Sequence, residues 1–166
     1  ESRQCNVENY RNNSTIGNNG SIGIMSKSYQ QGTFEPTNPK KYVGEYPIYY
    51  RSSWEAHCMR KFDSDPRYLK WASESIKIPY LNPFTGKYTV YVPDFLVEYE
   101  DANRNIIREI IEVKPRKETF LEEAKSDRNR AAVRLNMHKW AAAVIFAKDN
   151  GFGFRVLNEN DIFGTT

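Results

Sequence analysis

The side chains best suited to chemistry are two acids and a lysine in the middle of the chain. Asp94 follows a proline in the segment VYVPDFLVEY, and Glu112 and Lys114 lie two residues apart in REIIEVKP. Carboxylates supply the oxygen ligands that Mg²⁺ prefers, and a lysine ammonium orients a water molecule or a phosphate. These three side chains suit metal-assisted hydrolysis of a phosphodiester, provided that the fold brings them together.

The expected secondary structure does bring the three side chains together. Segments 88–100 and 106–114 are rich in β-branched and aromatic residues, which predicts two strands. Alternation along a strand sets Asp94 in an otherwise apolar row and puts Glu112 and Lys114 on one face. The polar turn between the segments is short enough for antiparallel pairing, so we expect Asp94 to lie opposite Glu112 and Lys114.

The remaining elements predict an α/β fold. In chain order we expect a helix over 53–62, a strand over 75–80, a turn at 82–86, a helix over 118–138, a buried strand over 141–147, a strand over 152–157 and a helical turn at 159–163. Glu74 is expected to be a structural turn residue just before the first of these strands. This order predicts a mixed sheet flanked by helices.

The chain is long enough for one domain and too short for two ordinary ones. Residues 1–24 are rich in Asn, Ser and Gly, so we expect a disordered or non-native extension, with Met25 as the natural start. Residues 25–51 contain three prolines and are expected to form an extended lead-in. The catalytic domain would then span 52–166.

The distribution of charge along the chain indicates where DNA would bind. The net charge is only +3, but residues 114–139 carry eight Lys or Arg against four acids. A basic helix beside the site would offer phosphate contacts, although a solvated, charge-paired face is the alternative interpretation. The candidate phosphate contacts are Arg51, Lys125, Arg128 and Arg134.

Several other classes of protein are poorly supported by the sequence. No apolar run is long enough for a membrane span, and no glycine-rich phosphate loop precedes a helix, so we expect neither a membrane nor a nucleotide cofactor as partner. The two cysteines and the two histidines have no zinc-ligand spacing.

Pro93-Asp94 followed by Glu112-Val113-Lys114 resembles the PD-(D/E)xK nuclease superfamily, whose members share an αβββαβ core. This resemblance implies a restriction-endonuclease-like fold from about residue 52 to residue 147. It also implies that Asp94, Glu112 and the Val113 carbonyl hold Mg²⁺, with Mn²⁺ as a substitute, while Lys114 positions the attacking water. Glu55 occupies the place of the helix acid that often precedes the aspartate in this superfamily, as a further ligand or assistant.

Longer stretches are similar to particular nuclease families. The segment RSSWE is similar to the transposon-end-cleaving subunit of the Tn7 type. NPKKYVGEYPIYYRSSWE, WASESIKIPYLNPFTGK and YVPDFLVEY are similar to the head-completion nucleases of tailed phages, over residues 34–114.

These resemblances imply a DNA endonuclease that acts on the packaged genome end. They place it in the host cytoplasm during phage assembly, or on the virion, with portal, head or neck proteins as partners. Two alternatives stay open. One is a structural neck or portal-associated protein that binds DNA, and the other is a transposase or repair subunit that cuts only with partners.

Overall fold

The computed structural model of this chain describes residues 30–164, so the expectations for residues 1–24 lie outside the described part. A central sheet has four strands in the order β3–β6–β7–β8. Their bounds are Tyr68–Ser73 for β3, Phe95–Glu100 for β6, Ile106–Val113 for β7 and Gly153–Leu157 for β8. β6 pairs antiparallel with both β3 and β7, while β8 runs parallel to β7. The predicted mixed sheet is therefore confirmed.

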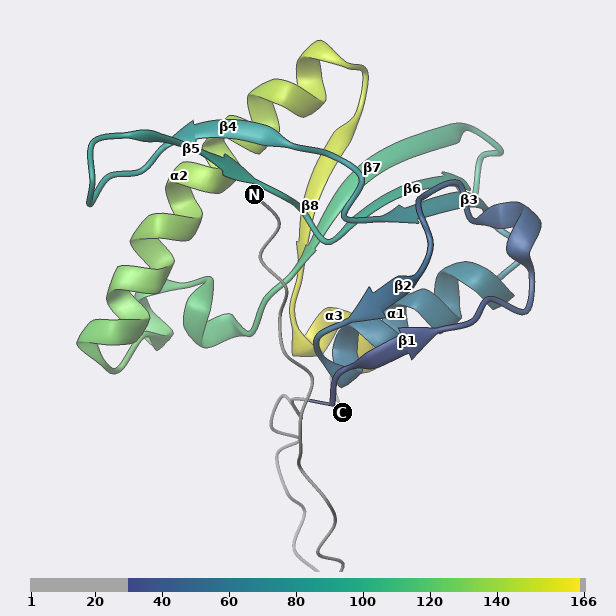
Figure 1. The fold of residues 1–166 in the computed structure, drawn as a ribbon, viewed down its shortest axis with the longest axis horizontal. Coiled ribbons are helices and arrows are strands. Elements are labelled where there is room, and N and C mark those ends of the chain that lie inside the picture. Colours follow the sequence, from purple (N-terminus) through teal and green to yellow (C-terminus); the bar gives the residue numbers. More distant parts are fainter. Residues whose placement is uncertain (1–29, 165–166) are drawn as a thin grey trace, which may run out of the picture.

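Helices lie on both faces of this sheet (Figure 1). They are α1 (Ser53–Ser64), α2 (Asp127–Asp149) and the short C-terminal α3 (Glu159–Phe163), with 3-10 turns η1 (Pro39–Lys41), η2 (Arg116–Glu118) and η3 (Leu121–Glu123). Side chains of β7 alternate between two apolar cores, because Ile111 and Val113 pack with α1 while Ile110 packs with α2. No helix in the described range 30–164 is long and apolar enough to cross a bilayer.

Helix α1 forms where the sequence predicted it. The Ser52 hydroxyl accepts a hydrogen bond from the Glu55 N–H and so caps the first turn. Trp54, Cys58 and Phe62, spaced four residues apart, are all buried against the sheet.

The expected strand over 141–147 is wrong, because these residues continue helix α2. Ala143 and Ala147, one helical turn apart, are buried, whereas Val144 and Ile145 between them are 53% and 63% exposed. Alanine also has the highest helix propensity, which extends the preceding helix through the apolar run. The last strand of the core is instead β8.

The start of α2 also differs from the expectation. The helix begins at Asp127 after the cap Ser126, whereas residues 116–123 form the two 3-10 turns rather than the first turns of a helix. The Ser126 side chain accepts a hydrogen bond from the Asn129 N–H and so fixes the start.

The expected strand over 88–100 is two strands in different sheets. β5 (Tyr88–Tyr91) pairs with β4 (Ile78–Leu81) as a separate hairpin, and β6 begins only at Phe95. Pro93 lacks an N–H and interrupts the ladder between them. The prediction that Asp94 lies in one apolar row of a single strand is therefore right only on the β6 side: Leu96 packs in the core beside α2, whereas Val90 belongs to the separate hairpin and is 55% exposed.

Strand β3 was not predicted, although it is one of the two edge strands of the central sheet. Its partner is β6, with Trp71 opposite Val97 and Ser73 opposite Phe95. The strand expected over 75–80 corresponds to β4, which packs against α2 instead of joining this sheet. The core order is thus α1, β3, β6, β7, α2, β8, with the β4–β5 hairpin inserted after β3.

The segment before α1 packs on the core. Strands β1 (Gly32–Phe34) and β2 (Ile48–Tyr50) pair antiparallel, and Tyr42 and Ile48 are buried in the α1 core. The buried Asp63 carboxylate accepts hydrogen bonds from the Thr37 and Asn38 N–H groups, with N···O distances of 2.8 and 3.0 Å. These hydrogen bonds hold Thr37 and Asn38 against the last turn of α1.

Replacing Asp63 with alanine should lower the free energy of unfolding by about 1–3 kcal/mol, because two backbone N–H groups lose their acceptor. Urea unfolding followed by circular dichroism measures this change. Asp127→Ala is the matched control, since the Asp127 side chain is 99% exposed and its ion pair contributes less than about 1 kcal/mol. Equal effects of the two variants would contradict the role of Asp63.

Candidate active site

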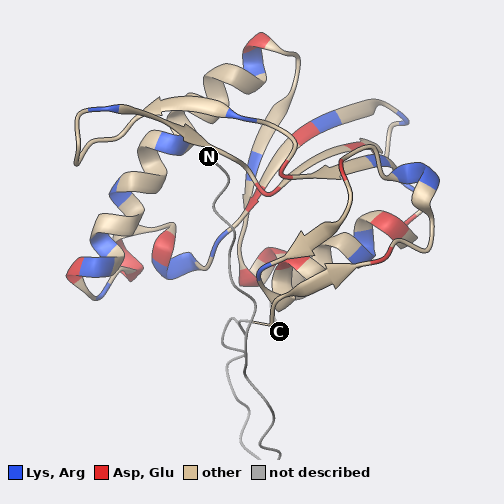
Figure 2. Ribbon diagram, viewed as in Figure 1, with Lys and Arg blue, Asp and Glu red and all other residues tan. Residues whose placement is uncertain are grey.

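Three elements meet at one hollow of about 390 Å³. The connection between β5 and β6 supplies Asp94, the end of β7 supplies Glu112 and Lys114, and the first turn of α1 supplies Glu55. Figure 2 shows acidic positions gathered where β7 ends beside the β5–β6 connection, with basic positions along α2. The structure therefore brings all four predicted site residues together.

Register explains why Asp94 lies beside the end of β7. Phe95 of β6 pairs with Ile111 of β7, so the residue before β6 falls next to Glu112. The half-buried Asp94 carboxylate accepts a hydrogen bond from the Val113 N–H at 2.7 Å. The Val113 side chain points into the α1 core, so only its backbone is available to the site.

Glu112 is almost fully buried, and both of its oxygens have partners. The Tyr91 hydroxyl donates to Oε2 at 2.7 Å, and the Lys114 ammonium lies 3.3 Å from Oε1. Alternation along β7 turns Glu112 to the same face as Ile110, which packs with α2. The carboxylate is thus held in one orientation before any ligand arrives.

Burial lowers the pKa of Lys114, but the negative charges of Glu112 and Asp94 outweigh burial and raise its pKa above the ordinary value. Lys114 is therefore an ammonium ion in this state. It donates hydrogen bonds and cannot accept a proton until the negative charge beside it is reduced.

Glu55 has a structural function as well as a place in the hollow. Its Oε1 accepts a hydrogen bond from the Ser52 hydroxyl at 3.0 Å, and its Oε2 accepts one from the Arg51 N–H at 2.7 Å. With the Ser52 cap, this closes the first turn of α1 in the manner of a capping box. Its position at the hollow is fixed by the helix start.

The carboxylates repel one another in the metal-free protein. Burial raises the pKa of Asp94 to about 8, and the charges of Glu112 and Glu55 act in the same direction, against Lys114 and the Val113 N–H. Burying acids this close together is unfavourable unless a cation joins them. The cluster therefore has the electrostatic character of a cation site.

The stability of the metal-free protein should fall as pH rises toward 8. Asp94 keeps a proton in the folded state that the unfolded state loses near pH 4, so between these values unfolding becomes easier by at most about 1.4 kcal/mol per pH unit. Asp94→Asn removes this dependence and keeps an oxygen for the Val113 N–H. Urea unfolding in EDTA at pH 6 and pH 8 compares the two proteins. Identical pH slopes would contradict the raised pKa.

A complete ligand cage is absent from residues 30–164, in which no three His, Cys, Asp or Glu side chains are arranged to hold a metal ion. Tyr91 and Lys114 engage Glu112, and the start of α1 engages Glu55. Mg²⁺ commonly keeps several waters and uses only one or two carboxylates. Asp94 and Glu112 beside an open hollow fit that requirement.

The four predicted phosphate contacts separate into two groups. Arg51 lines the hollow and forms an ion pair with Glu74. Lys125, Arg128 and Arg134 are exposed around the start of α2 and do not line the hollow. Their contact with DNA stays a prediction.

Among the further residues that line the hollow, three have titratable side chains that the sequence did not single out for the site. Tyr91 belongs to the β4–β5 hairpin, and its spacing from Asp94 carries no motif. Lys139 reaches the hollow from α2, where it was one basic residue among eight. Glu74 has a φ of 49°, which fits the predicted turn, and its carboxylate pairs with Arg51.

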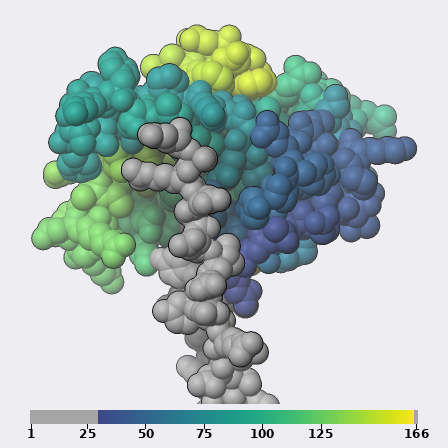
Figure 3. All heavy atoms as spheres, viewed as in Figure 1, coloured from purple at the N-terminus to yellow at the C-terminus, as the bar shows by residue number. Residues whose placement is uncertain are grey.

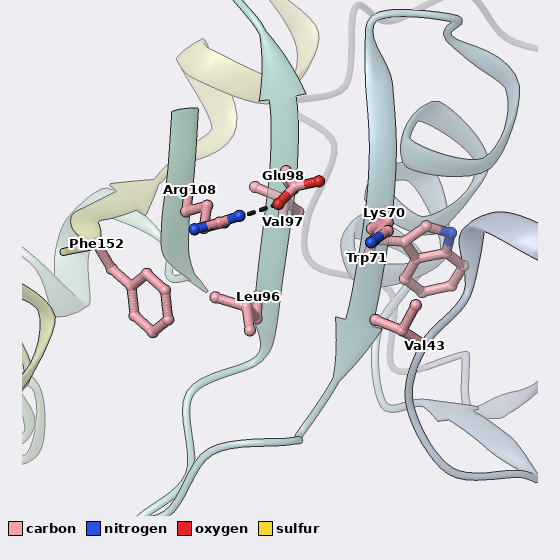
Figure 4. A pocket seen from close by; sticks show the side chains of 8 residues that line it. All are labelled: Val43, Lys70, Trp71, Leu96, Val97, Glu98, Arg108 and Phe152. Atoms are coloured by element: carbon pink, nitrogen blue, oxygen red, sulfur yellow. Dashed lines mark hydrogen bonds and ion pairs between the residues drawn. The ribbon is translucent and has the colours of Figure 1, made fainter. Parts of the chain in front are cut away.

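A second hollow of about 240 Å³ lies on the central sheet. Figure 4 shows Lys70 on β3, Glu98 and Leu96 on β6, and Arg108 on β7, with an ion pair between Glu98 and Arg108. Its lining is mostly apolar, and its one acid is already paired. It lacks the converging carboxylates of the first hollow.

Two similarities to known proteins bear on this geometry. Residues 65–159, more than half of the chain, match the sequence family described as TnsA-like endonuclease N terminal. The chain is also 31% identical over 142 residues to the head completion nuclease of Enterobacteria phage T4, covering 79% of this chain and 92% of that protein. The matched family range contains Asp94, Glu112 and Lys114.

Proposed function

We propose that this chain, which belongs to the family of TnsA-like endonuclease N-terminal domains, hydrolyses DNA phosphodiester bonds with a divalent metal ion. The observation that carries the proposal is the convergence of Asp94, Glu112 and Lys114 at one hollow. Two carboxylates repel each other there, and one ammonium accompanies them. Such a set binds a hard cation and, through the cation, a phosphate.

The residues that would hold Mg²⁺ are Asp94 and Glu112, with the Val113 carbonyl and Glu55 as further ligands. Mn²⁺ has similar ligand preferences and should substitute. When bound, the metal lowers the pKa of a water molecule and offsets negative charge on the phosphate. The fixed orientation of Glu112, held by Tyr91 and Lys114, means that little reorganisation is needed before binding.

In the proposed reaction, a water oxygen forms a bond to phosphorus and gives up a proton to solvent, and the bond from phosphorus to the leaving deoxyribose oxygen breaks. Lys114 is an ammonium beside Glu112, so it orients the attacking water or donates to a non-bridging phosphate oxygen. As negative charge beside Lys114 is neutralised, its pKa falls and it becomes able to exchange a proton with that water. The leaving oxygen takes a proton from solvent.

We propose that this activity serves the completion of phage heads. The protein would act on the packaged genome end in the infected cell. Support comes from the extent of the similarity to the head completion nuclease, which covers 92% of that protein. Portal, head or neck proteins are the partners that this setting implies. A purely structural role at the neck would predict DNA binding without turnover.

A cleavage assay tests the proposal. The full chain is incubated with linear and closed circular duplex DNA in EDTA, and then with Mg²⁺ or Mn²⁺. We expect cutting only with metal, and circular DNA reports internal cuts while end-labelled linear DNA reports cuts near the end. DNA binding without cutting in either metal would favour the structural role.

A further inference from the structure

A second lysine reaches the candidate active site from α2. The Lys139 side chain is half-buried and lines the same hollow as Asp94 and Glu112. Its ammonium lies over two aromatic rings, 5.7 Å from the ring centre of Tyr91 and 5.9 Å from that of Tyr80. Such contacts are favourable and restrict where the ammonium can lie.

The β4–β5 hairpin forms the platform beneath Lys139. Tyr80 and Tyr91 are buried between the hairpin and α2, where they pack in one core with Ala143. Ala143 follows Lys139 by one helical turn, so Lys139 lies on the face of α2 that meets the hairpin. In Figure 3 the hairpin, in teal, stands directly against α2, in green. The hydroxyl of Tyr91 also donates a hydrogen bond to Glu112. The Tyr91 side chain therefore contacts both Lys139, through its ring, and Glu112, through its hydroxyl.

The cations at the hollow differ in their partners. Arg51 forms an ion pair with Glu74, and Lys114 forms one with Glu112. Lys139 has no ion pair or hydrogen bond to any residue in the described range 30–164. Among the described residues that line the hollow, Lys139 is therefore the cation whose charge is not already shared with a carboxylate in an ion pair.

We infer that Lys139 binds a DNA phosphate at the candidate active site, and that Tyr91 is a positioning residue for both Lys139 and Glu112. This inference rests on the proposed function, because it takes DNA as the ligand. A phosphodiester that enters beside several carboxylates is attracted more strongly by an unpaired ammonium than by one whose charge Glu112 already offsets, so Lys139 adds to any contact made by Lys114. Partial burial of Lys139 strengthens its attraction for that phosphate relative to a solvated surface lysine.

The test measures DNA affinity by fluorescence anisotropy at several salt concentrations in EDTA, where no cutting occurs. Lys139→Met should weaken binding about tenfold and lower the salt slope, the change of log K with log salt, by about one. Lys139→Arg should keep both values near those of the wild type. Lys148→Met, an exposed lysine on the same helix, is the matched control and should change neither.

An unchanged salt slope for Lys139→Met, with wild-type DNA binding intact, would overturn the inference and leave the proposed function standing. Weaker binding without a slope change, together with a lower melting midpoint, would assign Lys139 a structural role and also overturn the inference. If the wild type binds DNA but never cuts it, the proposed function fails while the slope still decides the role of Lys139. Absence of wild-type DNA binding would overturn both.

Tyr91→Phe separates the two functions of that ring. It keeps the surface under Lys139, so DNA affinity and salt slope in EDTA should stay unchanged. It removes the hydrogen bond to Glu112, so the Mg²⁺ concentration that gives half of the thermal stabilisation should rise about tenfold or more. An unchanged Mg²⁺ requirement would contradict the positioning role of Tyr91.

Discussion

Lys114→Met should lower the single-turnover cleavage rate by about 10²–10⁴-fold, because the substitution keeps the apolar stem and removes the ammonium that orients water or phosphate. The ammonium lies 3.3 Å from Glu112, so its removal also leaves a buried carboxylate without its cationic partner. We therefore expect the variant to be less stable without metal. Circular dichroism at low temperature verifies that it is folded when its rate is measured.

The matched control for this variant is Lys70→Met. Lys70 lies on β3 at the second hollow, which holds no converging acids. The same chemical change there should leave the cleavage rate within about twofold, since surface charges away from a site contribute little. Equal rates for the wild type and Lys114→Met would remove Lys114 from the proposed reaction.

The second large effect concerns metal binding. In the wild type, Mg²⁺ at 100 times its dissociation constant should add about 2.7 kcal/mol to the free energy of unfolding. Asp94→Asn should be more stable than the wild type in EDTA at pH 8, because the repulsion that raises the pKa of Asp94 is gone. The same variant should gain almost nothing from Mg²⁺, since it lacks a carboxylate ligand.

Thermal melting with and without Mg²⁺ measures both parts of this prediction. Asp101→Asn is the control, because Asp101 lies in the exposed turn between β6 and β7, away from the hollow. An Asp94→Asn protein that gains as much from Mg²⁺ as the wild type would place the metal elsewhere.

The elements that hold the acids were predictable because their signals are local. Strand alternation correctly put Glu112 and Lys114 on one face, since the two side chains are in contact while Val113 between them packs in the α1 core. The short polar turn after β6 correctly implied antiparallel pairing, which places Asp94 beside Glu112. The predicted helix over 53–62 likewise begins where expected, at a start that Ser52 caps and Glu55 supports.

The errors have physical causes as well. A short apolar run such as 141–147 suits a buried strand or a helix, and only its continuity with the preceding turns of α2 decides between them. Pro93 marks a break between β5 and β6, but it does not say that the two pieces enter different sheets. That choice depends on the packing of β4 and β5 against α2, which is a tertiary effect.

Residues supplied by long-range packing were not recognisable in the sequence. Tyr91 reaches Glu112 only because the hairpin folds against α2, and Lys139 reaches the hollow from a helix that follows β7 in the chain. A single sequence offers no local pattern for either contact. The motif residues are detectable by spacing, whereas the groups that orient them depend on the assembled fold.

The most direct test of the central claim compares two glutamates on the same sheet. Glu112→Gln and Glu98→Gln make the same chemical change, one at the hollow with Asp94 and one in the ion pair with Arg108. Cleavage of circular DNA in Mg²⁺ is measured for both variants and for the wild type, all purified identically. We predict that Glu112→Gln cuts at least about 100-fold more slowly while Glu98→Gln stays within about twofold of the wild type. Cutting by Glu112→Gln at the wild-type rate would contradict a nuclease site built on Asp94, Glu112 and Lys114.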